Sequence, residues 1–507
     1  MWWRDAVVYQ VYVRSFADSD GDGLGDLPGV RDRLPYLRDL GVDAVWLTPF
    51  YPTPDADYGY DVTDHRAVDR RFGTLDDVDG LVDDAHGLGL RVLLDLVPNH
   101  TSSEHPWFRA ARADATHPDR RRYVFRPGRD GGPPNNWTSA FGGPAWTLDD
   151  AGGEWYLHFF TPQQPDLDWH NPAVRRDFED VLRFWLDRGI DGFRIDVAQG
   201  LFKDAGLRDM TEPDPVPWWA DWHTAMNQAD LHPLYRRWRA ILDAYPGERA
   251  LVGEIVLRDH AALADYVRSD ELHLTFNFAL FHADWDADAL RTTIDEAVAA
   301  FEAVGAAPCW VLENHDAPRL PARYGGGRRG RRRARAAALL MLALPGAVFV
   351  YQGQELCLNQ VDLPAEVLRD PAAASTAGVV QGRDGCRVPL PWGGGPPSFG
   401  FSTGEPWLPM PASWADATVE AQRDDATSAL SMWRTALACR PTGDDLAWRP
   451  VPEGALAFDR GELTCVVNID APPFEPPPGE VVVVSDPDAG RRLPPDTAAW
   501  VRRTADR

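Results

Sequence analysis

Residues 192–197, Gly192-Phe193-Arg194-Ile195-Asp196-Val197, form a short apolar run that two charged residues interrupt. Side chains two apart on a strand point to the same side, so Arg194 and Asp196 are expected to share one face. The other face would carry Phe193, Ile195 and Val197. A guanidinium beside a carboxylate keeps that carboxylate ionised and oriented, as a nucleophile at a sugar carbon requires. A structural ion pair near the end of a strand is the alternative that these six residues leave open.

Seven further strand-like runs alternate with amphipathic helical patterns along the chain. Eight strands with helices between them are typical of an α/β fold, the (β/α)8 TIM barrel, whose active site lies where the strands end. The predicted strands span Val7–Phe16, Ala44–Phe50, Arg91–Val97, Gly192–Val197, Ala250–Ile255, Leu274–Phe278, Pro308–Leu312 and Ala347–Tyr351. The predicted helices span Pro28–Leu40, Leu75–Leu88, Ala173–Arg188, Trp218–Ala244, Asp286–Val304 and Arg328–Leu344.

The barrel pattern is interrupted once and is followed by a different pattern. Residues 101–170, after the third strand, are rich in Pro, Gly, Trp and Asn and too long for a simple loop, which predicts an inserted subdomain. Short strands with Pro, Gly and Asp turns then predict a C-terminal antiparallel β-sandwich domain over 439–507. The barrel itself is assigned to 1–100 and 171–438. The basic run Gly325–Arg335 is interpreted as the solvated start of a helix, because the chain is acidic overall.

Composition restricts the partners of this chain of 507 residues. Its formal net charge is −26 and Lys203 is its only lysine, which argues against nucleic acid and anionic membranes. No uncharged apolar run is long enough for a membrane span, and no signal-peptide pattern precedes the first strand. The five cysteines are scattered and lack metal-ligand spacing, as expected of reduced thiols in a cytoplasmic protein. No glycine-rich phosphate fingerprint follows an early strand, so no organic cofactor is expected.

Five motifs resemble those of the α-amylase family, glycoside hydrolase family 13. One of them resembles the extra signature of the oligo-1,6-glucosidase branch, although it ends in Asp168 where Asn is usual. Each motif is weak alone, but their order and their places on the predicted strands make the resemblance specific, and it covers nearly the whole chain. The motifs are Asp95-Leu-Val-Pro-Asn99-His100, Gln164-Pro165-Asp166-Leu167-Asp168, the hexapeptide 192–197, Gly253-Glu254 and Glu313-Asn314-His315-Asp316.

The resemblance implies a retaining, exo-acting α-glucosidase that releases glucose from short oligosaccharides or disaccharides. Asp196 would be the nucleophile, Glu254 the general acid/base and Asp316 the third carboxylate. Retaining glycosidases need one ionised and one protonated carboxyl roughly 5–5.5 Å apart. Arg194 would hold Asp196 ionised, and the apolar residues before Glu254 favour its neutral form. His315, with Asp316, would bind hydroxyl groups next to the reacting carbon.

A clamp on the terminal sugar is implied by the same resemblance. Tyr60 would stack under the first glucose ring, and Asp57 would close the pocket with an arginine. Arg387 is predicted to be this partner of Asp57, with Arg383 nearby in the motif Arg383-Asp384-Gly385-Cys386-Arg387. His100 would bind a further sugar hydroxyl. The alternatives are a turn cap for His100 and an ordinary surface salt bridge for Asp57.

Acidic residues at alternate positions, with glycines between them, follow the first strand. This is oxygen-ligand spacing for Ca²⁺, similar to the start of an EF-hand loop but without its late glutamate. In the branch that the chain resembles, the same loop is a structural Ca²⁺ site. The implied ligands are Asp18, Asp20, Asp22, the Leu24 carbonyl and Asp26. An acidic turn without a metal is the alternative.

The sequence defines the substrate and linkage specificity less closely than it defines the reaction. Val197, directly after the nucleophile, resembles the α-1,6-cleaving pattern, whereas Gln199 and Val388 replace the more usual His and Thr, so α-1,4 and α-1,6 cleavage both stay open. A transglycosylase or isomerase acting on sucrose, maltose or trehalose would form the same glucosyl-enzyme and is the first alternative. A non-catalytic barrel that binds partners is disfavoured because all three carboxylates are present. Whether the chain is a monomer or a homodimer is left open.

Overall fold

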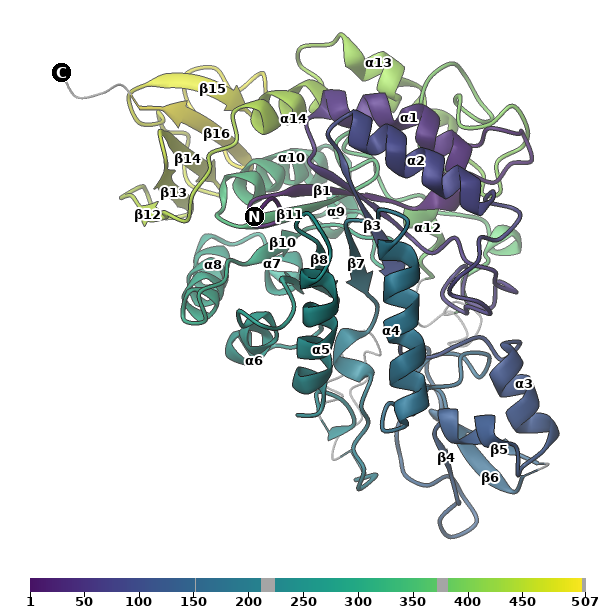
Figure 1. The fold of residues 1–507 in the computed structure, drawn as a ribbon. Helices are drawn as coiled ribbons and strands as arrows, with labels where there is room; N and C mark the ends of the chain where they lie inside the picture. The colour runs from purple at the N-terminus through teal and green to yellow at the C-terminus, as the bar shows by residue number, and fades with distance from the viewer. Residues whose placement is uncertain (151, 211–223, 372–381, 504–507) are drawn as a thin grey trace.

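The structure is a computed structural model that describes residues 1–150, 152–210, 224–371 and 382–503 (Figure 1). Its centre is a closed barrel of eight parallel strands in the order β1-β11-β10-β9-β8-β7-β3-β2, so the predicted TIM barrel is confirmed. Each barrel strand lies within a predicted one. Their bounds are β1 Val7–Val11, β2 Ala44–Leu47, β3 Arg91–Leu96, β7 Gly192–Ile195, β8 Ala250–Gly253, β9 Leu274–Asn277, β10 Cys309–Val311 and β11 Ala347–Tyr351.

Helices begin where side chains satisfy their first backbone N–H groups. Asp26 caps α1 by accepting the Gly29 N–H at 2.6 Å, and Thr74 and Asp77 form a capping box at the start of α2. The longer helices lie outside the barrel strands (Figure 1). They are α1 Leu27–Leu40, α2 Leu75–Gly87, α4 Pro172–Leu186, α5 Leu231–Asp243, α8 Ala287–Glu302, α10 Gly327–Ala343 and α14 Ala429–Ala438. The shorter helices are α3 Pro106–Ala113, α6 His260–Ala264, α7 Ala279–His282, α9 Leu320–Arg323, α12 Asp384–Arg387 and α13 Val419–Arg423.

Among the predicted elements that are shorter in the structure, two have a clear local cause. The predicted helix Trp218–Ala244 lies partly outside the described residues, and its described part is helical from Leu231 as α5. Pro233 accounts for this start, because proline fits the first turn of a helix and disrupts its interior. The hexapeptide strand ends at Ile195, and Val197 turns into the left-handed region at φ 46°. The expectation that Val197 lies beside Phe193 and Ile195 is therefore wrong.

The insert after β3 has a small sheet of its own, with the order β4-β6-β5. Its strands are β4 Phe125–Arg126, β5 Trp146–Asp149 and β6 Glu154–Leu157. The chain's only lysine joins the insert to the barrel. The Lys203 ammonium, on a residue 6% exposed, lies 2.9 Å from Asp166 Oδ2 and donates to Asn99 Oδ1 at 2.6 Å. The mouth of the barrel is thereby held against the segment 161–168.

The C-terminal strands form a five-stranded antiparallel sheet with the order β12-β13-β14-β16-β15. It packs on α10, where Trp500 donates to the Leu339 carbonyl at 3.1 Å. The run Gly325–Arg335 is not merely a solvated helix start, because Arg329 and Arg333 both pair with Asp496 beside this sheet. The strands are β12 Ala447–Trp448, β13 Ala455–Arg460, β14 Leu463–Asn468, β15 Glu480–Val484 and β16 Thr497–Arg502.

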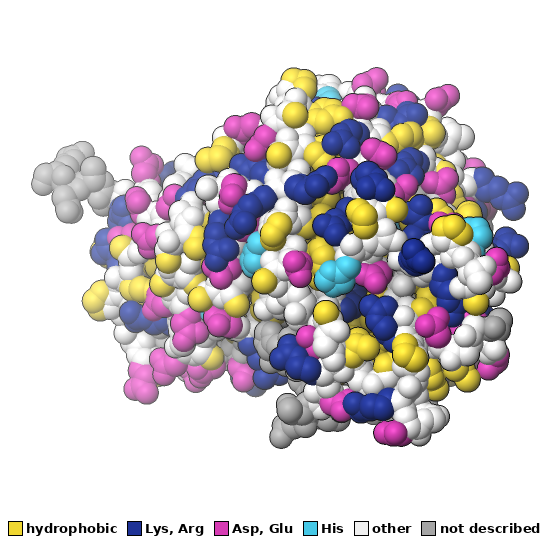
Figure 2. Space-filling view, turned by 60° about the horizontal axis from the view of Figure 1, so that its bottom comes forward, with side chains coloured by type: hydrophobic (Ala, Val, Ile, Leu, Met, Phe, Trp, Pro, Cys, Tyr) yellow, Lys and Arg dark blue, Asp and Glu magenta, His cyan; other side chains and the backbone are white. Residues whose placement is uncertain are grey.

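The surface carries mixed charge. On the face in Figure 2, arginine side chains lie among acidic ones and do not form a patch of one sign. Within the described ranges, no helix combines the length and apolar character needed to cross a bilayer.

Candidate active site

A cavity of about 280 Å³ opens where the barrel strands end. This volume is close to the lower end of the range typical of small-molecule sites, about 300–1,000 Å³. Residues from the loops after β2, β3, β7, β8, β9, β10 and β11 line it, and two residues of the insert, Ala140 and Phe160, complete it. The polar lining consists of Asp57, Tyr60, His100, Asp196, Gln199, Glu254, Asn314, Asp316 and Arg383. The structure therefore brings all three predicted carboxylates into one cavity.

One guanidinium organises three carboxylates at the floor of this cavity. Arg194 Nη1 lies 2.8 Å from Asp95 Oδ1 and 2.7 Å from Asp196 Oδ1, and its Nη2 lies 2.5 Å from Glu254 Oε1. The backbone N–H of Val197 donates to Glu254 Oε2 at 3.1 Å, so the left-handed turn there orients the carboxylate. The predicted contact of Arg194 with Asp196 is present, and Glu254 shares the same cation.

The protonation of this cluster follows from its burial. Burial raises the pKa of Asp95 to about 7, and it raises the pKa of Asp196 above its ordinary range, while Arg194 acts in the opposite direction on both. A single positive charge faces three carboxyl groups, so the cluster is expected to retain a proton near neutral pH. One ionised and one protonated carboxyl is the state that a retaining glycosidase uses.

Asp316 lies in a different electrostatic environment. Its Oδ1 accepts from Arg383 Nη1 at 3.1 Å and from Arg387 Nη2 at 2.9 Å. Burial opposes ionisation, but the neighbouring His315 and these two guanidinium groups hold the pKa of Asp316 below its ordinary range. Burial also lowers the pKa of the neighbouring His315, whose ring stacks on Tyr60 at 5.3 Å between centroids. Asp316 is therefore expected to stay ionised.

The predicted partner of Asp57 is wrong. Asp57 Oδ1 lies 2.5 Å from Arg383 Nη2, whereas Arg387 donates to Asp316 and, through Nε at 2.8 Å, to the His315 carbonyl. Arg383 precedes the short helix α12 and Arg387 ends it, so the two side chains leave the turn at different points. Asp370 fixes Arg383 further, accepting from its Nε at 2.9 Å and from its Nη2 at 2.8 Å.

His100 and Tyr60 bind each other as well as lining the cavity. The His100 Nε2 lies 2.9 Å from the Tyr60 carbonyl, and the Tyr60 hydroxyl donates to Asp95 Oδ2 at 2.9 Å. The ring nitrogens of His100 do not cap the turn at 101–102. Its Nε2 contacts the Tyr60 carbonyl, and its Nδ1 lies 3.1 Å from the Asn99 amide nitrogen.

Three site residues escaped the sequence reasoning. Asp95 is the first residue of a recognised motif but was given no role, and it contacts both Arg194 and Tyr60. Gln164 opens another motif and donates to Asp57 Oδ2 at 3.1 Å. Asp370 carried no signal, because it lies in a loop far from any strand end. For Asp95 and Gln164, the available signal in the sequence was their position in the quoted motifs.

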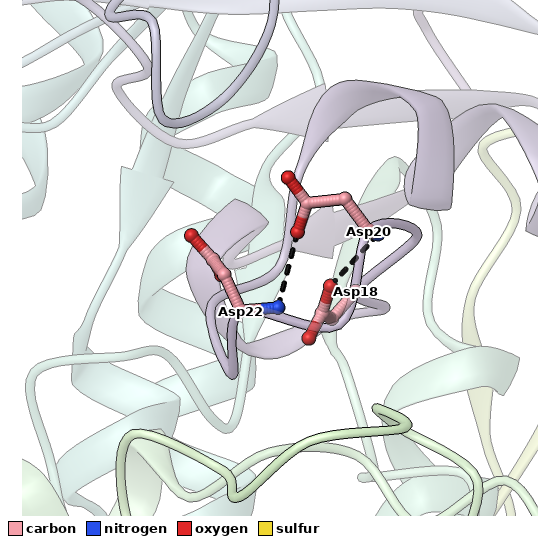
Figure 3. A group of neighbouring side chains, drawn as sticks. All are labelled: Asp18, Asp20 and Asp22. Carbon is pink, nitrogen blue, oxygen red and sulfur yellow. Dashed lines mark hydrogen bonds between the residues drawn. The ribbon is translucent and has the colours of Figure 1, made fainter.

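The predicted metal loop gathers three of its four aspartates (Figure 3). Carboxylate oxygens of Asp18, Asp20 and Asp22 all lie within 4.8 Å of one another. Such a group of hard oxygen donors fits Ca²⁺. Asp26 lies outside this group, because it caps α1 through Oδ1 and accepts the Ser19 N–H at 2.9 Å through Oδ2. Its role as a ligand, like that of the Leu24 carbonyl, stays a prediction.

Comparison with known proteins identifies related chains. The model of the α-amylase catalytic domain matches residues 10–448. A "probable alpha-glucosidase" of Rhizobium meliloti is 40% identical over 488 residues, covering 91% of this chain and 86% of its own. An oligo-1,6-glucosidase of Parageobacillus thermoglucosidasius is 34% identical over 484 residues, covering 88% and 85%. Among solved structures, an alpha-glucosyl transfer enzyme is 40% identical with a TM-score of 0.90, and 99% of each chain is covered.

Proposed function

Because the chain belongs to the α-amylase family of glycoside hydrolases, in its oligo-1,6-glucosidase branch, we propose that it is a retaining, exo-acting α-glucosidase. The proposed substrates are short α-glucosides with a terminal, non-reducing glucose. The observation that carries this proposal is the pair Asp196 and Glu254 on one guanidinium, opposite a cavity end that Asp57 and Arg383 close.

The proposed reaction uses the two carboxyl groups in turn. Asp196 attacks the anomeric carbon while Glu254 donates its proton to the leaving oxygen, which gives a covalent glucosyl-enzyme and a free alcohol. Glu254 then removes a proton from water, whose oxygen displaces Asp196 and releases glucose with retained configuration. Both groups contact Arg194, which supports the close spacing of roughly 5–5.5 Å that this mechanism needs.

The remaining site residues are proposed to hold the terminal sugar. Asp316, kept ionised by two arginines, accepts hydroxyl hydrogens next to the reacting carbon, and His315 and His100 bind further hydroxyls. Tyr60 lies under the ring. The ion pair of Asp57 with Arg383 ends the cavity, so a chain cannot pass beyond its terminal glucose. Release of one glucose at each event follows from this closed end.

Products formed from maltose, isomaltose, sucrose and trehalose test this function. Glucose should accumulate from at least one of them. From sucrose, whose leaving group is fructose, α-glucose should be the first anomer detected by proton NMR. A faster release from isomaltose than from maltose would support the expectation drawn from Val197. Initial release of β-glucose from sucrose would contradict the retaining mechanism, and no glucose from any α-glucoside would contradict the proposed function.

Transfer to a sugar acceptor is a second candidate. One observation favours it: a solved relative with 40% identity is described as an alpha-glucosyl transfer enzyme. The same glucosyl-enzyme would react with a sugar hydroxyl in place of water. In the product analysis above, new disaccharides accumulating in place of glucose would support this candidate.

The closed end of the cavity gives a specific prediction. Asp57→Asn keeps the shape of the side chain and leaves Arg383 paired with Asp370 and Asp316. A hydrogen bond to a charged group is worth about 1.5–3 kcal/mol, so kcat/KM for maltose should fall about 10- to 150-fold. Asp149→Asn is the matched control, because Asp149 is a buried carboxylate paired with Arg120 outside the cavity. Equal kcat/KM values in Asp57→Asn and the wild type would contradict the clamp.

We also propose that Asp18, Asp20 and Asp22 hold a structural Ca²⁺. A cation that binds only the folded state adds about 2.7 kcal/mol at 100 times its Kd. Chelation should therefore lower the Tm by several degrees, and added Ca²⁺ should restore it, as measured by calorimetry. Asp20→Asn should abolish this response, whereas Asp84→Asn, at an exposed carboxylate paired with Arg31, should keep it. A Tm that ignores chelation would count against the site.

A further inference from the structure

Strand β1 contains a single side-chain amide, that of Gln10. The residue is 2% exposed, and a buried amide is unfavourable unless its polar atoms have partners. Its Nε2 lies 2.7 Å from Nδ1 of His315, which follows β10 of the same barrel. Gln10 therefore contacts one of the proposed glucose-binding groups, although it does not itself line the cavity.

Aromatic stacking orients the His315 ring but does not distinguish its two nitrogens. The Tyr12 ring lies 5.5 Å from it between centroids at an interplanar angle of 24°, and the Tyr60 ring lies at 5.3 Å and 11°. These contacts fix the plane of the imidazole, whereas a neutral ring can carry its proton on either nitrogen. The hydrogen bond made by one nitrogen decides which of the two is protonated. The contact with Gln10 is such a bond.

The amide of Gln10 requires an acceptor at Nδ1. An amide NH2 group only donates, so an imidazole nitrogen 2.7 Å from it must carry a lone pair and no proton. Burial lowers the pKa of His315 well below its ordinary value, although the Asp316 carboxylate opposes this effect. A neutral ring without a proton on Nδ1 carries it on Nε2.

The other ring nitrogen lies beside the cavity. Within the described part of the chain, His315 Nε2 is buried without a hydrogen-bond partner, and Asp316 Oδ2 lies 3.3 Å from it. Both Asp316 and Tyr60, which flank the ring, line the cavity. A protonated Nε2 is thus a donor beside a carboxylate acceptor. A sugar hydroxyl donates and accepts at once, so it matches this pair and satisfies the buried N–H.

We propose that Gln10 is a positioning residue that fixes His315 in the Nε2-protonated tautomer, so that a donor beside the Asp316 carboxylate faces a hydroxyl of the terminal glucose. The inference rests on the proposed function and deepens it, because it names the residue that sets the polarity of one sugar-binding group. With the proton on Nδ1, two donors would face each other at 2.7 Å, and the Nε2 lone pair would face the Asp316 carboxylate. Both contacts would be repulsive.

Nitrogen-15 NMR of the full chain with labelled histidine reads the tautomer, because protonated and unprotonated ring nitrogens resonate far apart. His315→Gln identifies the His315 signals by their loss. In the wild type, Nε2 should be protonated and Nδ1 should not, and saturating glucose should move the Nε2 signal. In Gln10→Met, which keeps the length of the side chain but removes the donor, a fraction protonated on Nδ1 should appear. The inference would be overturned by a protonated Nδ1 in the wild type, by an Nε2 signal that ignores glucose, or by Nε2 protonation alone in Gln10→Met.

Kinetics with 4-nitrophenyl α-glucoside connect the tautomer to the reaction. Gln10→Met should lower kcat/KM about twofold to tenfold, as expected for one hydrogen bond between neutral groups. Gln422→Met is the matched control, because Gln422 is a buried amide of α13 that donates to the Leu356 carbonyl at 3.0 Å outside the cavity. It should change neither kcat/KM nor the His315 signals.

An unchanged kcat/KM in Gln10→Met would overturn the inference. If this variant does not fold, the wild-type spectra with and without glucose decide. A wild type that releases glucose from no α-glucoside would instead overturn the proposed function, while the tautomer of His315 and its dependence on Gln10 would still be measured.

Discussion

Replacing Asp196 by asparagine is expected to lower kcat for maltose and isomaltose by about 10⁴-fold or more while the protein still folds. An amide has nearly the same shape as the carboxylate but does not form the glucosyl ester. The substitution does not leave the buried Arg194 guanidinium without a carboxylate partner, because Asp95 remains at 2.8 Å and Glu254 at 2.5 Å. The loss should therefore appear in the chemistry and not in the stability.

The measurement is kcat for the purified variant, with Tm as the test of folding. Asp149→Asn again serves as control, since it changes a buried, arginine-paired aspartate away from the cavity. Asp95→Asn distinguishes a residue that positions Arg194 from one that reacts with the substrate. Asp95 contacts Arg194 and Tyr60 but does not line the cavity, so the decrease in kcat should be much smaller than for Asp196→Asn. Turnover above one hundredth of wild type in Asp196→Asn would remove this residue as the nucleophile.

Glu254→Gln is expected to show a loss that depends on the leaving group. General acid catalysis is worth about 10²- to 10⁴-fold, so hydrolysis of maltose should fall by that amount. A leaving group as acidic as 4-nitrophenol needs little protonation, so formation of the glucosyl-enzyme from its α-glucoside should fall far less.

Pre-steady-state kinetics with both substrates checks this prediction. Accumulation of a glucosyl-enzyme from the nitrophenyl substrate is the expected signature, because removal of the acid/base also slows its hydrolysis. Both substrates are measured on the same variant. Any effect of the substitution on Arg194, which contacts Glu254 in the wild type, is therefore common to both and does not account for a dependence on the leaving group. Equal losses for maltose and for the nitrophenyl glucoside would contradict the role of Glu254.

The sequence alone predicted the elements that local patterns define. Short apolar runs identified all eight barrel strands, because a strand buried between a barrel core and its helices must be apolar on both faces. The contact of Arg194 with Asp196 followed from two-residue spacing, and it is present at 2.7 Å. The acidic loop is likewise local, and Asp18, Asp20 and Asp22 do converge.

Contacts between distant segments were decided only by the tertiary structure. The Asp57 carboxylate could meet either of two arginines more than 300 positions away, and the turn at α12 selects Arg383. Spacing likewise did not show that the Asp26 carboxylate caps the start of α1. The basic run at the start of α10 looked solvated, but its Arg329 and Arg333 pair with Asp496, directly before β16. Local spacing fixes which side chains share a face, whereas the partner of a charged group depends on which remote segment the fold brings within about 3 Å of it.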